Sequence, residues 1–320
     1  MVDTARRHTV RGRPRARRTR CVLGIDVGGT NIRAGLFNPK DGSLHCVRSA
    51  RTEAAAGARH ALMRVADLAG QVVERGRAAG LIAHRVGIGI PELVGTDRRI
   101  ESQCSLHWSA DQVRESLAAH GEVTIASDVL AASLAEARLG AGRGHRVFLY
   151  VTVGTGISCA LVIDGQPFMG AHGHAISFAS GPTAAAIGER SAAAFAPLEA
   201  LASGPGILRR AKDRALTEPD AIALCRSALN GPGPAREIVD AAATELAIHV
   251  AILANALDPT LVVLGGGLGS SPGRYWSTFR AALPRYTFGP HMPRLRVCRA
   301  RLGTRAGMIG AAQSALETAA

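Results

Sequence analysis

The sequence has few aromatic residues and no long apolar run. Phenylalanine, tryptophan and tyrosine make up 4% of its 320 residues, whereas 47% are hydrophobic and 20% are charged. This balance is typical of globular chains and excludes wholesale disorder and a collagen-like fibre. No apolar run reaches the roughly 18 residues of a membrane-spanning helix, so we expect no membrane segment. The length suggests two domains of about 150 residues each.

Cysteine pairs at a metal-binding spacing are also missing. The six cysteines are scattered, and no CxxC pattern occurs. A disulfide scaffold and a zinc knuckle are therefore excluded, and a reducing, cytoplasmic location is favoured. The apolar stretch 21–25 is too short for the core of a secretory signal and ends at Asp26.

Lysine is almost absent, which narrows the choice of nucleotide-binding proteins. Only Lys40 and Lys212 occur, and neither lies in a glycine-rich loop. P-loop NTPases and protein kinases are excluded, because both need a lysine on the phosphates. The GxGxxG pattern of dinucleotide-binding folds is missing as well.

The net charge of +13 is concentrated at the start of the chain. Residues 1–20 hold eight arginines against Asp3, and the other 300 residues carry only +6. No aromatic residues interleave these arginines, so we expect a solvated, disordered tail and no nucleic-acid partner.

The rest of the chain alternates strands with helices, which predicts a mixed α/β fold. In the first half, strands are expected at 21–27, 31–37, 43–51, 85–91 and 122–127, and helices at 54–80, 111–120 and 128–139. In the second half, strands are expected at 146–153, 157–163 and 261–264, and helices within 183–257 and at 307–316.

Residues 23–30 and 149–156 share a strand–glycine turn–strand pattern, which indicates an internal duplication with one hairpin per lobe. We therefore expect a tail at 1–20, an N-terminal lobe at 21–140 and a C-terminal lobe at 141–320. The closing helix is free to return to the first lobe.

Three glycine loops follow three apolar strands. Free backbone N–H groups at such turns form anion-binding concavities. Together the loops favour a nucleotide polyphosphate held between the lobes, although each alone is compatible with an ordinary hairpin turn. The expected nucleotide-binding residues are Gly28, Gly29, Thr30, Asn31, Gly154, Thr155, Gly156, Gly265, Gly266 and Gly267.

These motifs resemble the ROK (repressor, open reading frame, kinase) family over about residues 21–317. The resemblance rests on several separate segments in the family's order, namely 26–33, 87–91, 140–144, 154–157, 257–267 and 303–312. It implies a two-lobed actin/hexokinase-like fold, which duplicates a ribonuclease H-like unit. It also implies that ATP and a sugar bind in the cleft between the lobes, with Gly265–Gly267 under the adenosine.

Two aspartates then become candidates for chemistry. Asp128 opens a helix, and a carboxylate there can take the proton of a hydroxyl that attacks the γ-phosphate. From spacing alone it could equally be a helix N-cap. Asp26 ends a strand beside the first loop, where it can orient Mg²⁺ directly or through water, or simply form the turn.

Departures from the family pattern gather on the substrate side. Ser127 stands where the family usually has Asn, Glu92 where it has Gly, and Ser177 where it has a Glu that grips hydroxyls near the anomeric carbon. The family's zinc-binding cysteines are missing, and His172 and His174 supply only two of about four ligands, so we expect no structural zinc. The expected substrate-lining residues are Glu92, His107, Trp108, Ser127, His172, His174 and Ser177, each of which could instead be core or surface.

The glycine loops match the family pattern, whereas the residues on the acceptor side depart from it. This difference favours a substrate without a normal hemiacetal. The sequence is similar to ROK kinases of antibiotic biosynthesis that phosphorylate the exocyclic hydroxymethyl group of C7 cyclitols of the valiolone and valienone type. An ordinary glucokinase is the alternative. A non-catalytic ROK-type regulator is the alternative from another class, although only 20 residues precede the first strand and Pro14 would break a helix there. A homodimer is common in the resembled family.

Overall fold

In the computed structural model, residues 18–181, 197–290 and 293–317 are described, and they form two five-stranded sheets. The first sheet has the order β3-β2-β1-β4-β5, with strands Leu44–Arg51, Asn31–Phe37, Thr19–Val27, Leu81–Ile90 and Glu122–Ser127. The second has the order β10-β9-β6-β7-β8, with strands Arg296–Arg299, Leu261–Gly265, Val147–Val153, Ile157–Ile163 and Gln166–Pro167.

The two sheets repeat one topology. β1, β2 and β3 form an antiparallel meander, and β4 and β5 continue from β1 in parallel. β6, β7 and β8 form the matching meander, and β9 and β10 continue from β6 in parallel. The predicted duplication and the mixed α/β class are therefore confirmed.

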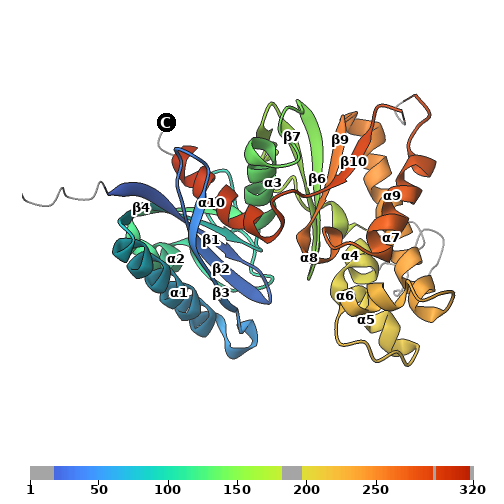
Figure 1. Ribbon diagram of the computed structural model, residues 1–320, viewed down its shortest axis with the longest axis horizontal. Coiled ribbons are helices and arrows are strands. Elements are labelled where there is room, and N and C mark those ends of the chain that lie inside the picture. The colour runs from blue at the N-terminus through green and yellow to red at the C-terminus, as the bar shows by residue number, and fades with distance from the viewer. Residues whose placement is uncertain (1–17, 182–196, 291–292, 318–320) are drawn as a thin grey trace, which may run out of the picture.

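Helices cover each sheet on its outer face (Figure 1). On the first sheet these are α1 (Ala58–Ala78) and α2 (Ala110–Leu117). Next to the second sheet lie the larger helices α7 (Pro234–Leu257) and α9 (Arg274–Tyr286) and the shorter helices α4 (Leu198–Ala202), α5 (Gly204–Asp213), α6 (Ala221–Ser227) and α8 (Gly266–Gly269). The helical pattern expected within 183–257 lies partly outside the described residues, as does most of the tail 1–20.

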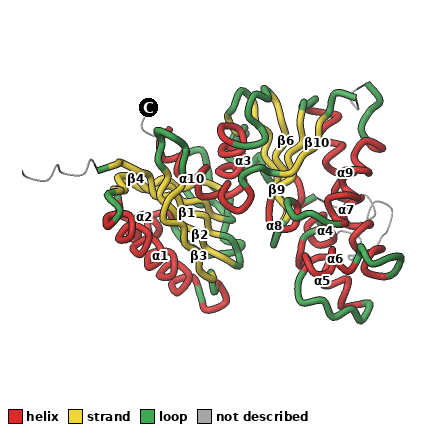
Figure 2. Tube along the Cα trace, viewed as in Figure 1, coloured by secondary structure: helices red, strands yellow, loops and turns green. Residues whose placement is uncertain are grey.

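Two further helices, α3 (Asp128–Leu139) and α10 (Ala306–Glu317), lie between the sheets (Figure 2). Alternation along β6 explains why a sheet can carry helices on both faces. Leu149 and Val151 belong to the core under α7, whereas Phe148 and Tyr150 belong to the core that contains α3 and α10. This shared core also includes Val22 of β1, so it joins the two lobes.

Glycines permit the close approach of α10. A side chain on Gly87 of β4 would overlap the carbonyl oxygen of Ala311, and one on Gly310 would overlap that of Ala131 in α3. The closing helix therefore packs directly on the first sheet and on α3, where even a methyl group has no room.

No helix among the described residues has both the length and the apolar character that crossing a membrane requires.

Candidate functional site

The two candidate aspartates lie at the same end of the first sheet. Asp26 in the central strand β1 pairs with Gly89 of β4, and Gly89 pairs with Ala126 of β5, two residues before Asp128. Gly89 has no side chain to separate its neighbours, and a Cβ built on it would lie 3.4 Å from the Asp128 Cα. The carboxyl ends of parallel strands thus bring two carboxylates to one edge, as in other open α/β sheets.

Each carboxylate has a raised proton affinity. Burial, together with the negative charge of Asp26, raises the pKa of Asp128 to about 7, against a 2.7 Å hydrogen bond that its Oδ1 accepts from the Val129 N–H. Burial likewise raises the pKa of Asp26 to about 6. The Arg33 guanidinium, 3.7 Å from Asp26 Oδ2, opposes that rise.

The three glycine loops meet beside this edge. A Cβ on Gly29 would lie 3.5 Å from Cγ2 of Thr155, and a Cβ on Gly154 would lie 3.7 Å from the backbone nitrogen of Gly267. Gly266 has φ +78°, in the left-handed region that favours glycine. The loops therefore bring together residues from both lobes that the sequence separates by more than 200 positions, as the expected polyphosphate site requires.

Glu199, in the first turn of α4, was not expected at this site. Its Oε2 accepts a 2.9 Å hydrogen bond from the Ile157 N–H, and it lies against Gly156 in the second glycine loop. The segment 198–205 was not singled out among the glycine loops, and nothing in its own residues reveals a contact with a loop more than 40 positions earlier.

Glu92 and Ser127 are buried, unlike side chains that line a solvent-filled cleft. The Glu92 carboxylate accepts hydrogen bonds from the loop that follows it, and the Ser127 hydroxyl donates to the Glu92 carbonyl oxygen at 2.8 Å. Trp108 is a core residue, whose Nε1 donates to the Ala58 carbonyl at 2.8 Å. His107 alone of these four is exposed.

The histidine loop of the second lobe reaches across to the first. Gly173 lies against the carbonyl of Val94, and the Nε2 atom of His174 is 2.6 Å from Oε2 of Glu101. His172 is exposed, with its ring centroid 6.3 Å from that of His174. Ser177 is exposed and directly precedes the 3-10 turn 178–180. Within the described parts of the chain, no three His, Cys, Asp or Glu side chains are grouped so as to hold a metal ion.

A model of the ROK family matches residues 22–318, and the chain therefore belongs to the ROK family. It is 32% identical to the kanosamine kinase of Amycolatopsis mediterranei over 259 positions, which span 78% of this chain and 80% of that protein. It is 28% identical to the glucokinase of Streptomyces coelicolor over 322 positions, which span 92% and 98% of the two chains.

Among solved structures, a ROK family glucokinase from Streptomyces griseus in complex with glucose and AMPPNP has the same fold. Its TM-score to this structure is 0.80 at 24% sequence identity, and the match covers 93% of this chain and 99% of that one. The actin/hexokinase-like fold expected from the sequence is thereby confirmed.

Proposed function

We propose that this protein is an ATP-dependent kinase that transfers the γ-phosphoryl group to a hydroxyl of a sugar or cyclitol, with Asp128 as general base. One observation carries the proposal. Asp128 lies beside a second half-buried carboxylate, that of Asp26, at the edge of the first sheet, where glycine loops from both lobes meet. Relatives named as a glucokinase and a kanosamine kinase support the reaction class.

The pKa of about 7 suits Asp128 to proton transfer near neutral pH. Its carboxylate accepts the proton of the acceptor hydroxyl while the hydroxyl oxygen forms a bond to the γ-phosphorus. The bond between that phosphorus and the oxygen bridging to the β-phosphate breaks, and ADP leaves with the electron pair. Backbone N–H groups of the loops at Gly28–Thr30 and Gly154–Gly156 bind the phosphates in place of a lysine.

The donor set fits Mg²⁺, which usually binds one or two carboxylates, water and substrate phosphates. Asp26 and Asp128 are half-buried like charges, and Arg33 compensates the charge of Asp26 in part, so a divalent cation would relieve their repulsion. Asp26 would hold the ion, directly or through water. When bound, the ion would neutralise charge on the phosphates.

For the acceptor we propose a C7 cyclitol phosphorylated on its exocyclic hydroxymethyl group, as in antibiotic biosynthesis. Ser177, a neutral and exposed residue, stands where related kinases carry a glutamate near the anomeric carbon. A cyclitol has no anomeric hydroxyl for such a carboxylate to bind. Glucose is the alternative, favoured by the likeness to the Streptomyces coelicolor glucokinase.

A phosphorylation screen tests both levels of the proposal. Purified protein with ATP and Mg²⁺ is offered valienone, valiolone isomers, inositols, glucose, fructose and N-acetylmannosamine, and products are identified by mass spectrometry. We expect the highest kcat/KM with a C7 cyclitol. A preference for glucose would replace the cyclitol, and ATP binding without any product would favour a regulator.

A further inference from the structure

The segment between β4 and α2, residues 91–109 (the acceptor loop), begins beside the proposed general base. Ile90 at the end of β4 pairs with Ser127, and the Ser127 hydroxyl donates to the Glu92 carbonyl at 2.8 Å. Glu92 is close enough for its charge to contribute to the raised pKa of Asp128. An acceptor whose hydroxyl reaches Asp128 must therefore lie near this loop.

Glu92 is bound by the loop that it begins. Its carboxylate is 4% exposed and accepts hydrogen bonds from the amides of Cys104 at 2.9 Å, Ser105 at 2.6 Å and Leu106 at 2.8 Å. The Ser102 hydroxyl is a fourth donor. These hydrogen bonds outweigh burial and hold the pKa of Glu92 below its usual range. Successive amides around an anion form a nest, here filled by the protein's own carboxylate.

The nest ends at a strained, exposed histidine. His107 has φ +53° and is exposed, whereas Leu106 and Trp108 on either side are buried. The left-handed conformation is unfavourable for a residue that carries a side chain. The hydrogen bonds to Glu92 on one side and the Trp108 anchor on the other offset that cost.

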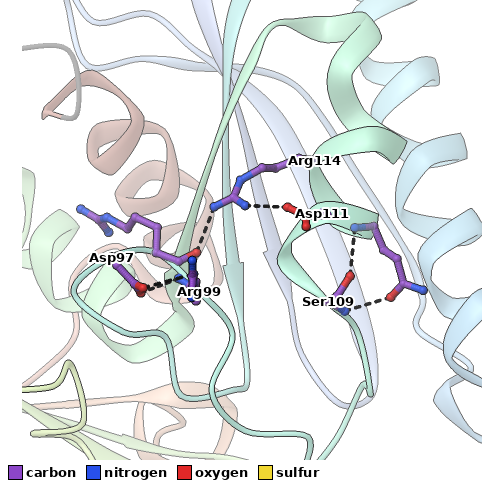
Figure 3. A network of polar contacts seen from close by, with 7 residues as sticks. Asp97, Arg99, Ser109, Asp111 and Arg114 are labelled. Carbon is purple, nitrogen blue, oxygen red and sulfur yellow. Dashed lines mark hydrogen bonds and ion pairs between the residues drawn. The ribbon is translucent and has the colours of Figure 1, made fainter.

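The remainder of the loop is fixed from two directions. In Figure 3 the Arg114 side chain of α2 contacts Asp111 at 3.1 Å and donates to the carbonyl of Arg98 at 3.2 Å, next to the Asp97–Arg99 contact. From the other lobe, His174 meets Glu101 at 2.6 Å. Contacts with α2 and with the second lobe therefore hold the acceptor loop in place beside Asp128.

We propose that Glu92 is a positioning residue for the acceptor. Its hydrogen bonds hold residues 102–107 in the conformation that contacts the acceptor ring, while the acceptor's hydroxyl reaches Asp128. Glu92 acts through the loop and does not touch the substrate. This inference rests on the proposed kinase function.

Glu92→Gln tests the role, because an amide places N–H donors against the amides of the nest. We expect the KM for the acceptor to rise at least about tenfold, in line with the roughly 1.5–3 kcal/mol of a hydrogen bond to a charged group. The KM for ATP should stay within about twofold, since the glycine loops are untouched. Amides of residues 104–106 should exchange hydrogen faster.

Glu136→Gln is the matched control. Glu136 is also buried and accepts from three amides, those of Ala141 at 2.7 Å, Arg301 at 3.1 Å and Leu302 at 2.8 Å, but at the junction of α3 with the segment before α10. It should lower the melting temperature comparably without a selective rise in the acceptor KM.

Unchanged exchange at 104–106 in Glu92→Gln would overturn the proposal, as would equal rises in both KM values. Absence of product with the unmodified protein would count against the kinase function itself. The exchange experiment would then still decide whether Glu92 organises the loop.

Discussion

Asp128 combines a chemical task with an energetic cost to the fold. Its carboxylate is half-buried beside Asp26, and both pKa values lie well above those of ordinary aspartates. A base with a pKa near 7 can both accept and release a proton at neutral pH, which suits proton transfer. A negative charge that is partly removed from water opposes folding, however.

Asp128→Asn should lower kcat by about 10²–10⁴-fold, the usual contribution of a general base. ATP affinity should change little, because the glycine loops bind the phosphates. Steady-state kinetics and calorimetric titration with ATP measure the two effects. Asp164→Asn, at an exposed aspartate paired with Arg146 and outside the site, is the control. Turnover of Asp128→Asn equal to that of the unmodified protein would rule out Asp128 as the base.

The same substitution should stabilise the protein in a pH-dependent manner. The folded-state pKa of about 7 lies above the ordinary aspartate value of 3.8, which applies in the unfolded chain. Ionisation therefore costs stability that is absent well below pH 4 and grows as pH rises through 4 to 7. Thermal denaturation at pH 8 should show a higher melting temperature for Asp128→Asn, and the gain should shrink toward pH 4. An equal gain at both pH values would contradict this account.

At the scale of elements, the close packing of α10 on α3 should make glycine more stabilising than alanine at position 310, the reverse of their usual order in helices. Alanine normally stabilises a helix by about 1 kcal/mol relative to glycine. Gly310, however, lies directly against the carbonyl of Ala131, and overpacking costs about 1–3 kcal/mol. Packing should therefore outweigh propensity at this position.

Gly310→Ala should consequently lower the free energy of unfolding, measured by urea denaturation. Gly70→Ala in α1 is the counterpart, because a Cβ there meets no atom within 4 Å. That variant should be as stable as the unmodified protein or more so, by up to about 1 kcal/mol. If both substitutions changed the free energy of unfolding in the same direction, contact with α3 would not determine which side chains position 310 tolerates.

Strands, glycine loops and the aspartate-led helix could be predicted from the sequence, because each has a local pattern. Glu92 could not be placed correctly, since its burial depends on amides 12–14 residues further on. Trp108 was ambiguous for a similar reason, as its anchor is the carbonyl of Ala58. Contacts between segments that are far apart in the chain, such as that of Glu199 with Ile157, leave no local pattern.

At the scale of the whole molecule, the lobes share a core yet present separate loops to one another. Gly29 of the first lobe faces Thr155 of the second with a methyl group's width between them. A nucleotide bound by both loops would therefore stabilise the two lobes together, by about 2.7 kcal/mol at a concentration 100 times its Kd.

Gly29→Ala should weaken ATP binding by about tenfold or more, because its methyl group would occupy the space between the loops where a phosphate approaches. Without nucleotide the melting temperature should change little, since the first atom that a Cβ meets is 3.5 Å away. Thermal shifts measured across an ATP titration distinguish the two effects. An undiminished ATP-dependent shift would place the phosphates elsewhere.

Because α10 covers β1 and β4, the sheet made first during translation is closed by a helix that is made only after the strands of the second sheet. The nascent N-terminal half must leave the ribosome with that face still bare. Completion of the first lobe is consequently delayed until the second has been synthesised, and a ribosome that stalls before residue 306 releases a chain with an exposed apolar sheet.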